Sequence, residues 1–148
     1  MTEPQDPVEN ESRSAPLLDR TFNSQRGGFH LRVMDDGRIY LRAFGKGSVE
    51  NAHAGVAYME EVFYTVPKMT FEALGDLREL SGSPIRVQFI LGKWLRRRRE
   101  HFTRGAIYGA SPWERRLASA ALVIARMTDV VRFTRTEAEA RAFLGWTD

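Results

Sequence analysis

The chemically most unusual stretch of the sequence is a basic run at residues 93–99, which holds Lys93, Arg96, Arg97, Arg98 and Arg99. At about 100° per residue, a helix places Lys93, Arg96 and Arg97 on one face and turns Arg98 towards the apolar stripe. We first interpret the run as a helix C-terminus, where cations complement the helix dipole and a long arginine stem lies along apolar surface. The alternative is a patch that binds an acidic protein, anionic lipid headgroups or nucleic-acid phosphates.

Two serines, Ser81 and Ser83, form a candidate partner-binding loop or phosphorylation site. Ser83 directly precedes Pro84, and serine followed by proline is a typical helix start, so we interpret Ser83 first as an N-cap. A helix N-terminus also favours anions, so a phosphate on either serine would be tolerated there. It would add about two negative charges to a surface loop and change which partners bind.

A glycine-rich turn, Gly45-Lys46-Gly47-Ser48, lies between an expected strand and an expected helix. Backbone N–H groups at such a turn can hold a phosphate. The segment lacks the spacing of a Walker loop and of the GxGxxG dinucleotide-binding motif. We therefore interpret it as a flexible strand-to-helix turn, with an anion site as the alternative.

The residue types needed for catalysis or metal binding are sparse. The chain has no cysteine, and none of its histidines has a serine or carboxylate at a recognised catalytic spacing: His30, His53 and His101. The adjacent Asp35 and Asp36 fit a tight turn. We expect no catalytic residues, no cofactor and no metal site, and therefore not an enzyme.

Length and composition predict one folded domain. With 148 residues, of which 43% are hydrophobic and 28% charged, the chain is ordinary for a globular protein. Residues 1–26 are rich in proline and polar residues and are expected to form a disordered tail, which leaves the domain at 27–148. No apolar run approaches the ~20 residues of a membrane span, and the absence of cysteine suits a reducing cytoplasm.

Hydrophobic periodicity predicts alternating strands and helices. Two period-2 runs around Asp36-Gly37 indicate a β-hairpin. The expected elements after it are a helix from Ser48 to Pro67, a strand at 69–77, a helix from Ser83 towards His101, a strand at 105–109, a helix from Ser111, a strand at 130–133 and a helix from Thr136 to Gly145. This order predicts a small α/β fold with a single, largely parallel sheet of about five strands and four helices packed on it. We expect Trp113 and Trp146 in the core or as lids over it.

Three segments of this pattern together resemble the STAS family: GDLRELSG at 75–82, GAIYGASPWE at 105–114 and VVRFTRTEAEARAFLGW at 130–146. The likeness covers about residues 28–146 and is greatest to the branch that resembles the sporulation anti-anti-sigma factor and the lipid-binding Sec14 fold. It implies a STAS-like α/β domain that acts as a regulatory or interaction module without catalysis. Some members are switched by phosphorylation of a serine at the start of the second helix. The matching loop here, ELSGSP at 79–84, has serines but lacks the aspartate that precedes the phosphorylated serine in those members.

The leading interpretation is a cytoplasmic, non-catalytic STAS-like module that binds a protein partner through residues 81–86 and the neighbouring helix. The first alternative is a domain that binds a small anionic ligand or a lipid headgroup at helix N-termini or at Arg96–Arg99. The second is nucleic-acid binding through the same arginines. The sequence leaves the partner and the oligomeric state open, with a homodimer among the options.

Overall fold

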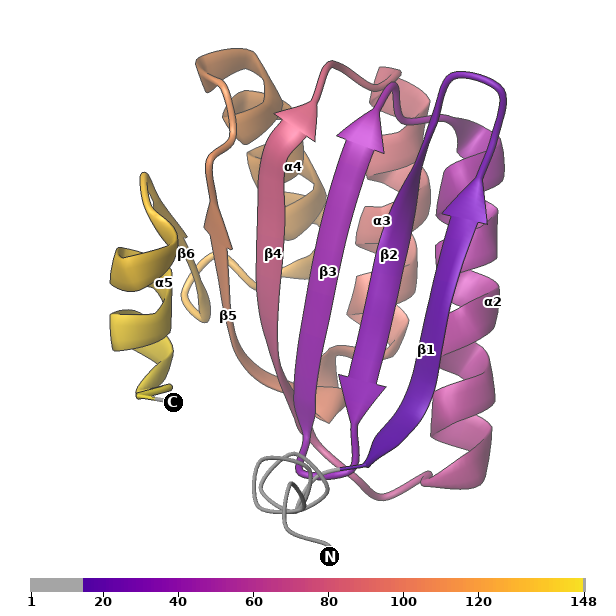
Figure 1. The fold of residues 1–148 in the computed structure, drawn as a ribbon, viewed down its shortest axis with the longest axis vertical. Coiled ribbons are helices and arrows are strands. Elements are labelled where there is room, and N and C mark those ends of the chain that lie inside the picture. Colours follow the sequence, from indigo (N-terminus) through magenta and orange to yellow (C-terminus); the bar gives the residue numbers. More distant parts are fainter. Residues whose placement is uncertain (1–14, 148) are drawn as a thin grey trace, which may run out of the picture.

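The computed structural model describes residues 15–147, which form one mixed β-sheet flanked by helices (Figure 1). The strands are β1 (Pro16–Asn23), β2 (Gly27–Met34), β3 (Arg38–Gly45), β4 (Phe71–Leu80), β5 (Phe102–Tyr108) and β6 (Val131–Thr134). The helices are α2 (Val49–Thr65), α3 (Ile85–Arg97), α4 (Pro112–Ala125) and α5 (Glu137–Leu144), with a short 3-10 turn, η1, at Arg99–His101. The predicted α/β class with a single sheet is confirmed, with six strands in place of about five.

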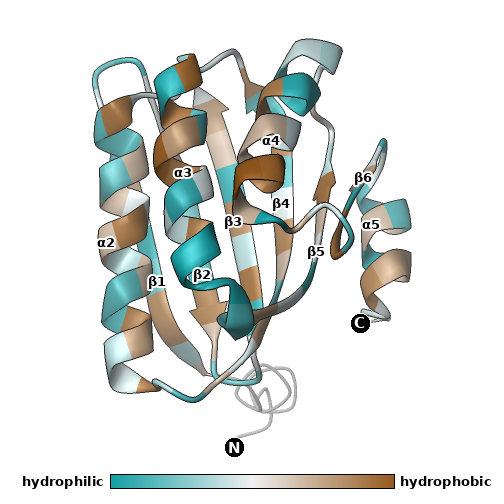
Figure 2. Cartoon of the chain, turned by 180° about the vertical axis from the view of Figure 1, so that it is seen from behind, coloured by the Kyte–Doolittle hydropathy of each residue, from teal (hydrophilic) through white to brown (hydrophobic). Residues whose placement is uncertain are grey.

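The strands lie in sequential order across the sheet, and the crossovers place three helices on one face. The β1–β2 and β2–β3 pairs are antiparallel, and the remaining pairs are parallel. Right-handed crossovers that advance in one direction all lie on the same face, so α2, α3 and α4 cover it together. Figure 2 shows these helices from behind, with the last turns of α3 in teal where the basic run lies. α5 follows the last strand and packs on the opposite face, mainly against β5 and β6.

The first strand lies inside the segment that was expected to be a disordered tail. β1 pairs with β2, with Leu18 opposite Val33 and Phe22 opposite Phe29, and Leu18 is buried in the core. The tail prediction for 1–26 is therefore wrong for residues 15–26, and residues 1–14 lie outside the described part of the chain. The polar composition of β1 is that of an edge strand, whose outer residues face solvent.

The predicted N-caps are confirmed for three helices and wrong for one. Their hydroxyls accept hydrogen bonds at 3.0–3.2 Å from backbone N–H groups three residues later: Ser48, Ser111 and Thr136. In α3, Pro84 itself occupies the N-cap position, and no side chain caps the helix. Ser83 lies one residue too early for this role, and its hydroxyl accepts instead from Nε2 of Gln88 at 3.3 Å.

Apolar packing is divided between the two faces of the sheet. Under α2 and α3, a large cluster joins inward-facing strand residues to Phe63 and Trp94. Under α5, a smaller cluster includes Leu74 and Tyr108. Trp146 is 4% exposed and belongs to this second cluster, which confirms its predicted core position.

Candidate functional site

The parallel strands end at one edge of the sheet, and the helices begin there. The loops after β3, β4, β5 and β6 lead into α2, α3, α4 and α5. Helix N-termini carry partial positive charge and N–H groups without helical partners, so this edge concentrates both. In open α/β sheets, ligands bind outside these carboxyl ends of the strands. We call this side of the molecule the carboxyl edge.

A cavity of about 590 Å³ opens at the carboxyl edge between three loops. The loops are the β1–β2 turn at 24–26, the β3–α2 loop at 46–48 and the β4–α3 loop at 81–84. The lining includes two cations, four hydroxyls and one indole: Arg26, Lys46, Ser24, Ser48, Ser81, Ser83 and Trp113. The fold thus brings the glycine-rich turn and the serine loop, which are separated by more than thirty residues, into one cavity.

Backbone hydrogen bonds hold two of these loops against each other. The Gly47 N–H donates to the carbonyl of Gly82 at 2.8 Å, and the Ser81 N–H donates to the carbonyl of Gly45 at 2.8 Å. A Cβ at Gly47 would lie 2.7 Å from Cβ of Ser83, so only glycine allows this close approach. Backbone contacts therefore fix the position of the β3–α2 loop against the β4–α3 loop.

The cavity offers cations and hydroxyls for binding. Arg26 and Lys46 form no ion pair with the described residues, and Glu50 is the one carboxylate in the lining. Within residues 15–147, none of the lining serines is hydrogen-bonded to a histidine or carboxylate side chain. The lining thus presents a guanidinium, an ammonium group and hydroxyls to a ligand.

The basic run lies at the opposite end of α3 from the cavity. α3 has 13 residues, so its ends are about 20 Å apart at 1.5 Å per residue. Lys93, Arg96, Arg97 and Arg99 are exposed and form no ion pair with the described residues. The two candidate sites from the sequence, the serine loop and the basic run, are therefore separate places on the surface.

Arg98 differs from the other cations of the run, as its helical register predicts. Its guanidinium turns towards α2, where Nε donates to Oε2 of Glu60 at 2.8 Å and Nη2 donates to Oε1. It also lies over the ring of Phe63, 5.2 Å from the centroid. The hydrogen bonds from Arg98 hold the pKa of Glu60 below its ordinary value, although burial opposes them. The structure thus removes Arg98 from the predicted patch, because its guanidinium is committed to a helix–helix contact.

Large apolar side chains are exposed at the carboxyl edge and one turn away from it. Ile85 and Phe89, 53% and 51% exposed, lie one turn apart on α3, and Trp113, 59% exposed, lines the cavity. The prediction that Trp113 belongs to the core is therefore wrong. Its spacing from Leu117 fits the buried stripe of α4, but it lies in the first turn, where the strands have ended.

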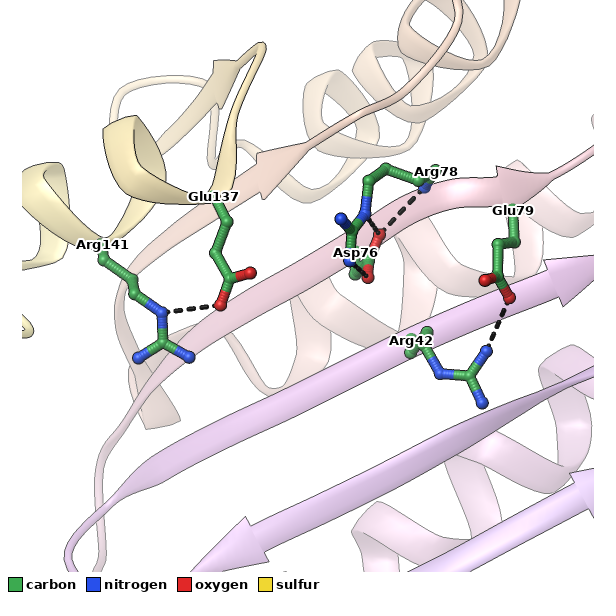
Figure 3. A network of polar contacts seen from close by, with 6 residues as sticks. All are labelled: Arg42, Asp76, Arg78, Glu79, Glu137 and Arg141. Carbon is green, nitrogen blue, oxygen red and sulfur yellow. Dashed lines mark hydrogen bonds and ion pairs between the residues drawn. The ribbon is translucent and has the colours of Figure 1, made fainter. Parts of the chain in front are cut away.

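The part of the sheet that α5 leaves open carries paired charges (Figure 3). Arg78 donates to both carboxylate oxygens of Asp76, at 3.0 and 2.8 Å, and Arg42 donates to Glu79 at 2.7 Å. Burial by itself would raise the pKa of Asp76, but the hydrogen bonds from Arg78 outweigh it and lower the pKa. Burial raises the pKa of Tyr108 to about 12, with the Asp76 charge adding to the effect. Asp76 and Glu79 are thus each bound to an arginine on this face of the sheet.

The histidines do not come together. Nε2 of His30 lies 2.6 Å from Oδ1 of Asp19. This pair could not be predicted from the sequence, because the composition around Asp19 indicated a disordered tail. His53 is exposed on α2, and His101 stacks on Phe63 with centroids 4.4 Å apart. Within residues 15–147, no group of three or more acidic or histidine side chains is placed to hold a metal ion. In the same part of the chain, every helix is too short or too polar to cross a membrane.

Comparison with known proteins identifies the fold. No protein-family model matches the sequence, and a search of curated proteins found no match. A DUF3478 family protein from Shewanella loihica with a SpoIIAA-like fold is 19% identical, with a TM-score of 0.58 over 88% of this chain and 94% of that one. The unphosphorylated anti-sigma factor antagonist SpoIIAA is 12% identical, with a TM-score of 0.52 over 86% of this chain and 98% of that one. The predicted STAS-like fold is confirmed, and at these identities the likeness concerns the fold alone.

Proposed function

We propose that this protein is a non-catalytic regulatory or scaffolding module of the cytoplasm that acts by binding another protein. The proposed binding surface is the carboxyl edge at residues 81–86 together with the exposed apolar side chains beside it. The similarity in fold to an anti-sigma factor antagonist supports a regulatory role.

The observation that carries the proposal is the exposure of Ile85, Phe89 and Trp113. Apolar and aromatic side chains that stay exposed beside a cavity are typical of protein interaction sites, because a partner gains free energy by burying them. Ser81 and Ser83 lie in the adjacent loop, where they can hydrogen-bond a partner. A phosphate on either serine would add negative charge to the same surface and alter partner binding.

The exposed cations of α3 extend this surface away from the cavity. Phe89, Lys93 and Arg96 follow one another at helical spacing on the exposed side of α3. A partner that lies along α3 would therefore meet apolar side chains near the carboxyl edge and positive charge further on. Complementary acidic residues at that end of the partner would speed association and select the orientation.

The test is capture of partners from the native cells, with wild-type and variant proteins as bait and quantitative mass spectrometry as the readout. The double variant Ile85→Ser/Phe89→Ser should keep its fold, because exposed substitutions usually change the free energy of unfolding by less than ~0.5 kcal/mol. Val123→Ser, at a position 64% exposed on α4, is the matched control. We expect a partner that binds the wild type and the control but not the double variant. A double variant that retains every protein enriched by the wild type would contradict the proposal.

The unpaired cations of the cavity favour a second candidate, the binding of a small anionic ligand or a lipid headgroup. Arg26 and Lys46 lie in the lining together with the N-terminus of α2, and both features attract anions. Calorimetric titration with inorganic phosphate and sedimentation with anionic vesicles would test the two sources. Binding that is lost in Lys46→Gln supports this candidate, and equal binding by the wild type and Lys46→Gln rules it out.

Nucleic-acid binding through Lys93, Arg96, Arg97 and Arg99 is the remaining alternative. Single-stranded sites combine cations with exposed aromatic rings on which bases stack. The aromatic residue inside the run, Trp94, is 6% exposed, so it does not provide such a platform. Gel-shift assays at low and raised salt that compare the wild type with the site variant Arg96→Glu/Arg97→Glu test this alternative.

A further inference from the structure

A second cavity, of about 580 Å³, lies at the free β6 edge of the sheet. It is lined by Arg115 from α4, by residues 132–135 from β6 and the turn after it, and by residues of α5 that include Phe143. Because α4 and α5 pack on opposite faces of the sheet, a cavity lined by both crosses the edge of β6. We call it the β6-edge cleft.

The edge strand β6 has unpaired backbone groups in this cleft. Its one neighbour is β5, where the Gly105 N–H donates to the carbonyl of Val130 at 3.0 Å and Gly105 lies opposite Val131. In parallel pairing only alternate residues bond a given neighbour, so the N–H and C=O groups of Val131 and Phe133 point away from β5. Phe133 lines the cleft, so its backbone groups are placed to bond an added strand.

Positive charge flanks this edge on both faces of the sheet. The guanidinium of Arg115 lies over the ring of Phe133, 5.3 Å from its centroid, and that of Arg132 lies over Phe143 at 4.8 Å. Neither arginine forms an ion pair with a described residue. Stacking on a ring orients the planar guanidinium and leaves its in-plane N–H groups free to bond a carboxylate.

The remaining charges of the cleft do not neutralise these arginines. Arg135 adds a third cation, and Glu139 is the one carboxylate in the lining. Oε1 of Glu139 accepts a hydrogen bond from the backbone N–H of Arg135 at 3.1 Å, where it helps to close the start of α5. The cleft therefore combines an open strand edge with an excess of positive charge.

We infer that the β6-edge cleft binds an extended acidic peptide segment, which pairs with β6 as a further strand and places its carboxylates on Arg132 and Arg115. Successive side chains of a strand point to opposite faces, so two adjacent acidic residues reach one arginine each. Bidentate arginine–carboxylate pairs would then supply specificity and the backbone bonds would supply register. A free phosphate or a nucleic acid would use the guanidinium groups but not the strand edge. The β6-edge cleft shares no lining residue with the carboxyl-edge cavity, and the inference stands independently of the proposed function.

The experiment measures binding of a short fluorescent peptide, TVTEEVTV, to the full chain by fluorescence anisotropy. Three probes accompany it. TVTQQVTV lacks the charges, and TVPEEPTV has two prolines that remove one backbone N–H donor from each of the two registers in which the peptide could pair with β6. Inorganic phosphate is the competitor. Arg132→Gln and Arg115→Gln are the test variants, and Arg116→Gln is the matched control, since Arg116 is exposed on α4 but does not line the cleft. Hydrogen exchange of the Phe133 amide, followed by NMR, reports strand pairing directly.

We expect TVTEEVTV to bind, with affinity about tenfold weaker in Arg132→Gln and Arg115→Gln, unchanged in Arg116→Gln, and lost for the glutamine and proline peptides. Exchange of the Phe133 amide should slow when the peptide binds. The inference is overturned by an absence of saturable binding, by equal binding of TVPEEPTV, by an unprotected Phe133 amide in the complex, or by phosphate that displaces the peptide at an equal molar concentration.

Discussion

The carboxylate of Glu60 on α2 is held by the guanidinium of Arg98, the residue directly after α3, with Nε donating to Oε2 at 2.8 Å and Nη2 donating to Oε1. Nε1 of Trp94 donates to the same Oε2 at 2.7 Å. These contacts join the C-terminal halves of two neighbouring helices and leave the other cations of the basic run in solvent. Substitutions at adjacent arginines should therefore have different effects on stability.

Arg98→Glu should lower the free energy of unfolding by about 1–2 kcal/mol, because it removes charge-assisted hydrogen bonds and places a second carboxylate beside Glu60. Thermal and urea unfolding measure the effect. The double variant Arg96→Glu/Arg97→Glu, at exposed positions without ion pairs, should stay within ~0.5 kcal/mol of the wild type. Equal stability of the two variants would contradict the position of Arg98 against α2.

Acid should weaken the same contact. The pKa of Glu60 in the folded chain lies below its ordinary value of 4.5, mainly because of the hydrogen bonds from Arg98. As the pH falls, the Glu60 carboxylate is therefore protonated in the unfolded chain before it is protonated in the folded chain. The stabilisation from its contact with Arg98 is complete above about pH 4.5 and is lost as the pH drops through the lower folded-state pKa. Urea unfolding at pH 7 and pH 3 should show that the stability difference between the wild type and Glu60→Gln shrinks at pH 3. A stability difference that does not change with pH would contradict the prediction that protonation of Glu60 weakens its contact with Arg98.

Leu18→Ala should lower the free energy of unfolding by about 2–4 kcal/mol, because Leu18 is 7% exposed and packs in the cluster under α2 and α3. Thr21→Ala, at an exposed position of the same strand, should change it by less than ~0.5 kcal/mol. Urea unfolding monitored by circular dichroism compares the two. If Leu18→Ala were as stable as Thr21→Ala, β1 would not be part of the core.

The order of elements after Gly27 could be predicted because local and tertiary preferences agree there. The alternating residues Phe29, Leu31 and Val33 of β2 are buried, and the hydroxyls of Ser111 and Thr136 cap the helices that the sequence placed after them. β1 could not be predicted from composition. Its stability comes from pairing with β2, which lies later in the chain, and its outer residues are polar as in an edge strand.

The candidate sites could be predicted only in part, because cavities are formed by residues that are distant in sequence. The serine loop and the glycine-rich turn were each recognisable, but their contact depends on the parallel pairing of β3 with β4. Arg26 joins them from a turn that composition assigned to the tail. The β6-edge cleft had no sequence signal, since Arg115 and Arg132 come from separate elements and meet only at the end of the sheet.

Ser111→Ala should lower the free energy of unfolding by about 1 kcal/mol, because the Ser111 hydroxyl accepts from the Glu114 N–H and donates to the Glu114 carboxylate. Ser83→Ala should cost less, since Ser83 caps no helix and makes one long hydrogen bond with Gln88. Thermal unfolding of both variants provides the comparison. A larger loss for Ser83→Ala would restore Ser83 as the cap of α3.

The two tryptophans that were expected in the core or as lids over it, Trp113 and Trp146, should respond differently to truncation. Trp146 is 4% exposed, its ring centroid lies 5.3 Å from that of Tyr40, and its Nε1 donates to Oε1 of Glu72 at 2.8 Å. Trp146→Ala should therefore lower the free energy of unfolding by about 3–5 kcal/mol. Trp113 is 59% exposed, so Trp113→Ala should change the free energy of unfolding by less than ~0.5 kcal/mol. Urea unfolding of both variants measures the difference, and acrylamide quenching should be reduced in Trp113→Ala because the accessible indole is gone. A strongly destabilised Trp113→Ala would return this residue to the core and remove it from the proposed binding surface.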